Sequence, residues 1–324
     1  MNESQAKIES VASLKEKLEQ FGIYPGQPLG GPVEHTDGFF NRAVNNGRTY
    51  TDLGKYLDKE LPSQLLSFLE IHCQTWADAE ALIEERYFIE QMASLKTVNS
   101  NLIVYAHAPY LEVPSGEIRP YHFNYLLLKP PLDLVKAEKV REIEPEQFYS
   151  FIEALAREKI PYLTVHLSTP GYFLNKDEFS AAREKIKKLA RFAQKHGVII
   201  GMETGGATAE QLEKLAQLEN VRITWDEEHA ILDNLSPDLF PRLLAENKIG
   251  LVHLAVPVGG KHNQGELTKA TDEQRRRIGT VVKLVGDRNR GVVLAEEAKI
   301  IPVMLETTPD IENYEILGDM VEGL

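Results

Sequence analysis

From about residue 64 onward, short apolar runs alternate with amphipathic segments along the chain. Seven runs are visible: Leu65–Cys73, Leu102–His107, Tyr162–His166, Val198–Glu203, Val221–Asp226, Gly250–His253 and Ile300–Glu306. Continuous apolar runs are typical of strands buried on both faces, and their alternation with helices indicates parallel strands joined by crossover helices. With a further strand expected around Pro32–His35, the pattern predicts about eight strand–helix units.

The segments between the runs have the spacing of amphipathic helices. They are Glu84–Lys96, Pro145–Lys159, Asp177–His196, Ala207–Leu218, Ser236–Asn247 and Thr271–Val285. The clearest of them, Asp177–His196, is followed by Gly197, a residue typical of a helix C-cap. Another helix is expected over Ser4–Phe21, ended by Gly22, after which Pro25 and Pro28 indicate a loop.

These units favour a single (β/α)8 TIM barrel over residues 31–324, preceded by an N-terminal helical extension over residues 1–30. An open doubly wound sheet is the alternative, but it would require a glycine-rich fingerprint after the first strand, and none is present. The length of 324 residues fits one barrel with additions. One addition is a long insertion after the third strand, at residues 112–144, which has the length of a lid or a partner surface.

Composition limits the chemistry further. The single cysteine, Cys73, excludes a disulfide framework and a cysteine-ligated zinc site. The chain carries 36 basic and 49 acidic residues, and this net charge of −13 argues against a uniformly basic nucleic-acid-binding surface or a polybasic membrane anchor, but leaves room for a local basic face. No apolar run approaches the roughly 18 residues of a membrane span, and the N-terminus lacks the features of a signal peptide. We therefore expect a cytoplasmic protein without a membrane partner.

Six of the seven visible strands end on a histidine or a carboxylate. The residues are His107, His166, Glu203, Asp226, His253 and Glu306. Because the C-terminal ends of barrel strands converge on one face, these side chains are expected to meet at the mouth of the barrel. Clustered carboxylates would repel one another without cations, so a metal is expected there. Histidine and carboxylate together suit Zn²⁺, Mn²⁺, Fe²⁺ or Co²⁺, whereas carboxylates alone would favour Mg²⁺.

Two more histidines follow the sixth and the seventh of the eight expected strands. His229 stands three residues after Asp226, so both side chains can face the mouth. His262 follows Lys261 in a loop that contains three glycines, where backbone can approach a ligand closely. One polar residue at a strand end is unremarkable, but six strands that share the pattern indicate a site.

Four segments also match known motifs in order and spacing. They are His-Ala-Pro-Tyr-Leu at 107–111, Glu-Thr-Gly-Gly at 203–206, Asp-x-x-His at 226–229 and Pro-Val-Met-Leu-Glu-Thr-Thr-Pro at 302–309. Together they resemble endonuclease IV, the family 2 apurinic/apyrimidinic endonucleases, over residues 65–310. The same general pattern is shared by the wider xylose isomerase-like superfamily, which includes sugar isomerases and epimerases.

The endonuclease IV resemblance implies hydrolysis of phosphodiester bonds at abasic sites in DNA by a cluster of two or three Zn²⁺ ions. It implies that Glu203 and Glu306 bridge metals and are catalytic, and that Tyr110 and Leu111 enter the DNA stack. DNA binding would also need basic residues around the mouth, and Lys261 is a candidate for contact with substrate. The implied ligands are His107, His166, Glu203, Asp226, His229, His253 and Glu306. His262 is a further candidate ligand, in place of the family's loop His with a shifted register; the alternative is that the third metal is lost. The chain departs from the family by lacking an Asp in the loop after the seventh strand and an Arg after the second.

The alternative is a mononuclear sugar or sugar-phosphate isomerase or epimerase. In it Glu203, Asp226, His253 and Glu306 hold a single Mn²⁺, Mg²⁺ or Co²⁺, and two of the carboxylates exchange a proton with the substrate. The net charge and the missing Asp and Arg favour this alternative. A degenerate barrel that only binds a ligand is a third, non-enzymatic reading. The motif matches favour the first, so we expect a zinc-dependent hydrolase of abasic-site DNA.

Overall fold

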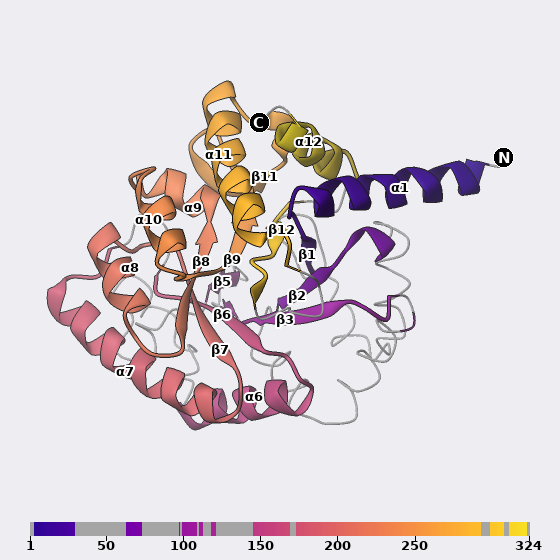
Figure 1. The fold of residues 1–324 in the computed structure, drawn as a ribbon. Coiled ribbons are helices and arrows are strands. Elements are labelled where there is room, and N and C mark those ends of the chain that lie inside the picture. Colours follow the sequence, from indigo (N-terminus) through magenta and orange to yellow (C-terminus); the bar gives the residue numbers. More distant parts are fainter. Residues whose placement is uncertain are drawn as a thin grey trace.

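The computed structural model describes residues 3–29, 63–72, 97, 99–108, 110–112, 118–120, 145–168, 173–292, 299–307 and 311–322. Within these ranges, eight parallel strands close a barrel in the order β1-β12-β9-β8-β7-β6-β3-β2 (Figure 1). They are β1 (Pro25–Leu29), β2 (Phe68–His72), β3 (Ile103–His107), β6 (Tyr162–His166), β7 (Ile199–Glu203), β8 (Val221–Asp226), β9 (Ile249–Leu254) and β12 (Val303–Leu305). The predicted single (β/α)8 barrel is confirmed.

The described helices pack along the outside of the barrel (Figure 1). They are α1 (Glu3–Gln20), α6 (Pro145–Arg157), α7 (Lys176–Lys195), α8 (Ala209–Ala216), α9 (Glu227–Leu232), α10 (Leu239–Ala245), α11 (Asp272–Asn289) and α12 (Ile311–Glu322). Helix α7 begins at an Asn175 cap that accepts two backbone N–H groups, and Gly197 follows it at a φ of 73°. Both ends therefore lie where their capping residues predict.

The first strand lies where the two prolines had indicated a loop. Segment Pro25–Leu29 is β1 and pairs with β12 on one side and β2 on the other. The Tyr314 hydroxyl donates to the carbonyl of Gly26 at 2.9 Å, and the Gln27 amide donates to the carbonyl of Thr307 at 3.0 Å. Tertiary pairing thus overrides the local proline signal. The strand expected at Pro32–His35 and the helix expected at Glu84–Lys96 lie outside the described residues.

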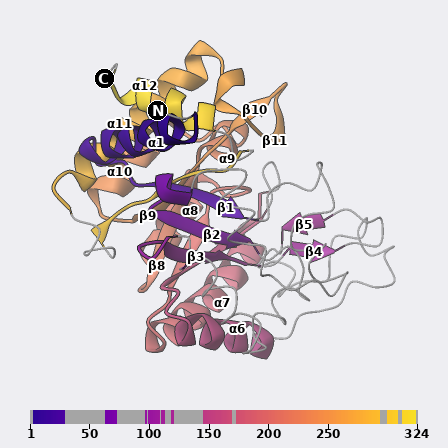
Figure 2. The same ribbon diagram turned by 90° about the vertical axis from the view of Figure 1, so that its right-hand side faces the viewer.

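Helix α1 lies beside α12, as Figures 1 and 2 show. Lys17 of α1 forms ion pairs with Asp319 at 3.4 Å and Glu322 at 3.1 Å, both on α12, so the contact between the two helices includes surface ion pairs. Among the described helices, none has the length and apolar character needed to cross a membrane.

Layers of side chains fill the barrel interior, as alternation along each strand requires. At the N-terminal end of the strands, Tyr105 and Tyr162 stack with ring centroids 4.9 Å apart. Gly201 makes room for this stack, because a Cβ there would lie 2.4 Å from the Tyr162 ring. Glu70 and Thr164 form part of the next layer, two residues further along their strands than Phe68 and Tyr162. The strand ends above them carry the histidines and carboxylates.

Two short hairpins follow the C-terminal ends of barrel strands. Strands β4 (Tyr110–Glu112) and β5 (Ile118–Pro120) pair at the start of the predicted insertion after β3. Strands β10 (Val256–Val258) and β11 (Lys261–Gly265) pair directly after β9. In Figure 2, β4 and β5 lie on the side to which β2 and β3 point, which is the mouth of the barrel.

Candidate metal centre

The six strand-end residues meet at the mouth, and each is at most 4% exposed. Strand register brings them level: His166 pairs with Glu203 across β6 and β7, and Asp226 pairs with His253 across β8 and β9. Their potential ligand atoms form two groups, and within each group the atoms lie within 4.8 Å of one another. The first group is His107, His166 and Glu203. The second group is Glu203, Asp226, His253 and Glu306.

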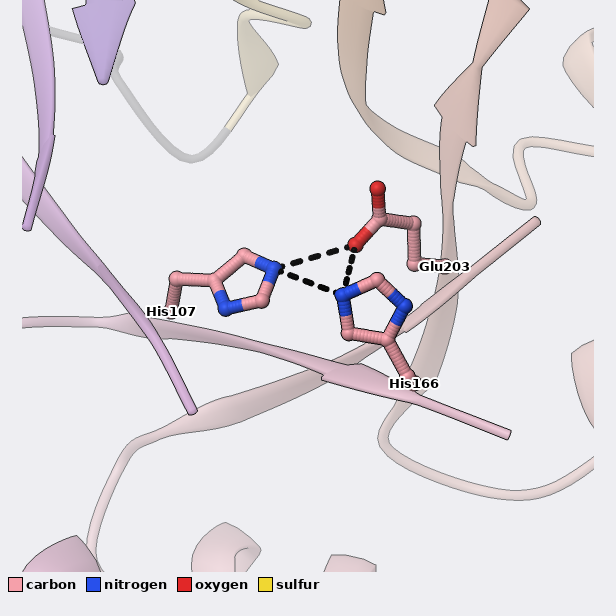
Figure 3. A group of neighbouring side chains, drawn as sticks. All are labelled: His107, His166 and Glu203. Carbon is pink, nitrogen blue, oxygen red and sulfur yellow. Dashed lines mark hydrogen bonds and ion pairs between the residues drawn. The ribbon is translucent and has the colours of Figure 1, made fainter. Parts of the chain in front are cut away.

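The first group forms a triangle (Figure 3). Nε2 of His107 lies 3.1 Å from Oε2 of Glu203 and 3.0 Å from Nε2 of His166, which is itself 3.0 Å from the same oxygen. The carbonyl of Ala108 accepts from Nδ1 of His107 at 2.9 Å, so the neutral ring carries its lone pair on Nε2. That lone pair faces a carboxylate oxygen. A cation between them, a proton or a metal ion, removes the repulsion.

The second group uses the other oxygen of Glu203. Oε1 lies 3.4 Å from Nδ1 of His253, and Oε2 of Glu306 lies 3.8 Å from the same nitrogen. Asp226 accepts the backbone N–H of His229 on Oδ1 at 2.7 Å, while its buried Oδ2 has no hydrogen-bond partner among the described residues. Three carboxylates and one imidazole fit a divalent cation. Glu203 can therefore bridge two cation sites, one on each oxygen.

The carboxylates differ strongly in their affinity for protons. Burial acts to raise the pKa of Glu203, but the charge of His166 and hydrogen bonds from His107 and His253 hold it well below its usual range. Burial raises the pKa of Glu306 well above its usual range, and the charges of Asp226 and Glu203 add to this effect. Burial also raises the pKa of Asp226. A divalent cation would offset this crowding of negative charge.

His229 lies beside the cluster but belongs to neither group. Its Nδ1 donates to the carbonyl of Thr204 at 2.5 Å and is 3.6 Å from Oε1 of Glu203. Gly205, at a φ of +140°, makes this approach possible, because a Cβ there would lie 3.0 Å from Nδ1 of His229. The neutral ring keeps its lone pair on Nε2, so His229 retains a potential ligand atom.

The remaining predicted site residues are placed only by their backbone. Tyr110 and Leu111 lie on β4, and Lys261 and His262 lie on β11. Their side chains lie outside the described part of the chain. Their roles as DNA-inserting, substrate-binding and metal-binding residues stay predictions.

Sequence reasoning missed Glu70, which lies inside the apolar run of β2 and is fully buried. Its Oε2 is 2.9 Å from Nε2 of His253, and its Oε1 accepts from the Thr164 hydroxyl at 2.6 Å. The available signal was a carboxylate two residues after Phe68, on the inward face of a strand. Because the run Leu65–Cys73 was taken as uniformly apolar, the single carboxylate inside it was not predicted to have a role.

Comparisons with known proteins support the fold. No protein-family model and no curated protein matches the sequence. Among solved structures, D-psicose 3-epimerase with D-tagatose, from Clostridium cellulolyticum H10, has a TM-score of 0.53 at 13% identity and covers 93% of this chain and 96% of its own. The 3-keto-D-glucoside 4-epimerase of E. coli has a TM-score of 0.52 at 13% identity, covering 92% and 98%.

A probable 3-DHS dehydratase from Bacillus anthracis has a TM-score of 0.54 at 12% identity, covering 93% of this chain and 98% of its own. At these identities the likeness shows the fold alone. The neighbours share the barrel that the xylose isomerase-like resemblance implied. The closer resemblance to endonuclease IV rests on the sequence motifs.

Proposed function

We propose that the chain is a divalent-metal-dependent isomerase or epimerase of a small sugar or sugar phosphate. The observation that carries the proposal is the second group, in which Glu203, Asp226, His253 and Glu306 place their ligand atoms within 4.8 Å at the barrel mouth. This donor set suits Mn²⁺, Zn²⁺ or Co²⁺, and Mg²⁺ less well because of the histidine. A bound ion of this kind polarises a substrate carbonyl.

Glu203 and Glu306 have the properties of a proton acceptor and a proton donor. The pKa of Glu203 is held well below its usual range by the three histidines around it, although burial opposes this. The pKa of Glu306 is raised well above its usual range, first by burial. Two carboxyl groups with pKa values pushed apart are typical of an acid–base pair. Glu203 would take a proton from the carbon beside the carbonyl, and Glu306 would return one.

Two further observations support a small substrate. The net charge of −13 opposes long-range attraction of a polyanion such as DNA. Two of the structurally similar proteins are epimerases of sugars by their names, and the likeness extends over more than nine-tenths of both chains. Neither observation identifies which sugar binds.

Proton exchange with solvent tests this function directly. The metal-loaded protein is incubated in D₂O with a panel of ketoses and ketose phosphates, and ¹H NMR follows the C–H groups beside the carbonyl. We expect deuterium to enter at one such carbon, and the exchange to disappear in Glu203→Gln and Glu306→Gln. Fully metal-loaded wild-type protein that exchanges no proton on any member of the panel would contradict the proposal.

A second candidate function is hydrolysis of phosphodiester bonds at abasic sites in DNA. One specific observation favours it: the first group, His107, His166 and Glu203, offers a second cation position that shares Glu203. Two or more Zn²⁺ ions suit phosphodiester hydrolysis because negative charge builds on several oxygens at once. Incision of a duplex with one abasic site tests it, and an intact duplex after incubation with protein carrying two Zn²⁺ per chain would exclude it.

A further inference from the structure

We infer that Glu70 is a positioning residue that holds the ring of His253 with Nδ1 toward the metal centre. The inference rests on the proposed metal-dependent function and assigns a role to a residue that belongs to neither ligand group. It begins from the two ring nitrogens of His253, which face different carboxylates.

The ring of His253 lies between the metal centre and Glu70. Nδ1 faces the centre, 3.4 Å from Oε1 of Glu203 and 3.8 Å from Oε2 of Glu306. Nε2 faces the layer below, 2.9 Å from Oε2 of Glu70. Without a metal, Nδ1 also lies within hydrogen-bond distance of Oε1 of Glu203. When a cation occupies Nδ1, the ring proton is left on Nε2, beside the carboxylate of Glu70, which can only accept. The lone pair then lies on Nδ1, the nitrogen that faces the other ligands.

Glu70 is itself held in place. The Thr164 hydroxyl donates to Oε1 at 2.6 Å, which leaves Oε2 directed at His253. Glu70, Thr164 and His253 are all completely buried, so bulk water has no access to replace the contact. Strand β2 thereby supplies a support for a ligand on β9, across the barrel interior.

A carboxylate behind a metal-binding histidine has a known physical effect. It sets the tautomer, limits rotation of the ring and makes the ligand nitrogen more basic, and its removal weakens metal binding by roughly 10–100-fold. A residue that only fills space would contribute none of this. The two roles are therefore distinguished by a substitution that keeps volume and removes the acceptor.

The first experiment measures Zn²⁺ affinity by competition with a chelator for the wild type, Glu70→Met and Glu70→Gln. We expect Glu70→Met to bind roughly 10–100-fold more weakly. Glu70→Gln should recover much of the loss, because its carbonyl can still accept from Nε2. Glu227→Gln is the matched control, since Glu227 is a fully buried carboxylate bound to Trp225 and Arg277 instead. Wild-type affinity in Glu70→Met would overturn the inference.

The second experiment needs no variant at Glu70. Long-range ¹H–¹⁵N spectra of the Zn²⁺-loaded wild type, with ¹⁵N-labelled histidine, report which ring nitrogen carries the proton. Comparison with His253→Gln assigns the signal. We expect His253 to be protonated on Nε2, and protonation on Nδ1 would overturn the inference even if Glu70→Met does not fold. A wild type that binds no divalent metal would overturn the proposed function as well, whereas metal binding with the opposite tautomer overturns this inference alone.

Discussion

Glu203 contacts both ligand groups at the barrel mouth. Its Oε2 lies 3.1 Å from His107 and its Oε1 lies 3.4 Å from His253, and the side chain is 1% exposed. Both of these histidines therefore draw on Glu203 for charge compensation when no metal is bound. At the scale of single residues, this is where a substitution has the largest expected effect on function.

Glu203→Gln should weaken metal binding and reduce activity together while the fold is kept. The amide keeps the size of the side chain but cannot supply two anionic oxygens, so we expect metal affinity to fall at least about 10-fold. Catalysis that uses Glu203 as a base should fall about 10²–10⁴-fold. Metal content, turnover and the far-UV circular dichroism spectrum would be compared with wild type. Unchanged turnover would remove Glu203 from the site.

The sequence predicted the candidate ligands at the strand ends, but it did not reveal the buried groups that contact those ligands and hold them in place. The histidines and carboxylates that end β3, β6, β7 and β8, and His253 one residue before the end of β9, could be found because an apolar run has a visible end. Glu70 could not, because its function depends on a contact between β2 and β9, which are far apart in the chain. The position of His229 depends on the Thr204 carbonyl and the open space above Gly205, which residue spacing does not reveal.

At the scale of elements, the end of α11 is hydrogen-bonded to two segments that are distant in the chain. Asn289 is fully buried and donates to the carbonyls of Gly22 at 2.9 Å and Ile301 at 2.8 Å. Its side-chain oxygen accepts the N–H of Ile301 at 3.0 Å. One side chain thereby connects the turn before β1, the helix α11 and the approach to β12.

Asn289→Ala should destabilise the protein without affecting the metal centre. It leaves buried backbone groups without partners, and each such group costs about 1–3 kcal/mol. Urea unfolding of the metal-free protein would measure the loss, and chelator competition would show unchanged affinity. Asn289→Asp is the control, because it keeps the acceptor for Ile301 and loses both donors. A loss under about 0.5 kcal/mol, the range of a surface substitution, would contradict this role.

Strand β1 shows the limit of element prediction from sequence. Its residues, Pro-Gly-Gln-Pro-Leu, have low strand propensity, and its position depends on pairing with β12 and β2 and on the Tyr314 hydroxyl. Strands β6 to β9 were predictable because most of their residues are apolar and because amphipathic helices flank them, two of which, α7 and α8, begin at capping boxes. For β1, where the local strand preference is weak, the pairing with β12 and β2 determines the structure.

At the scale of the whole molecule, the buried cluster links stability to pH. Burial opposes protonation of His253 and His107, but the charges and hydrogen bonds of Glu70 and Glu203 raise both pKa values above the ordinary one. A group with a raised pKa stabilises the fold fully below its unfolded pKa, about 6.5 for histidine, and loses this contribution as pH rises through the folded pKa. Glu306 and Asp226, whose pKa values burial raises, have the same sign.

The metal-free protein should therefore lose thermal stability as pH rises from about 6.5. Glu203 has the opposite sign, but its lowered pKa affects stability only as pH falls through the acid range. With Zn²⁺ or Mn²⁺ the trend should reverse, because metal competes with protons for the same ligands and binds more tightly as pH rises. Tm measured by calorimetry from about pH 6 to about pH 9, with chelator and with metal, tests this. A metal-free Tm that rises over this range would contradict it.

The barrel as a whole was predictable because strand and helix patterns alternate over most of the chain. The function was less so, because the same strand-end pattern serves a zinc hydrolase and a sugar epimerase. The number of cations separates these readings, and it depends on whether the first group, His107, His166 and Glu203, holds one.

An anomalous difference map from crystals soaked in Mn²⁺, recorded above the manganese absorption edge, tests the central claim most directly. We predict a peak in contact with Glu203, Asp226, His253 and Glu306. A second peak between His107, His166 and Glu203 would favour the hydrolase. A map from crystals soaked at saturating Mn²⁺ that shows no peak at the barrel mouth would contradict the account.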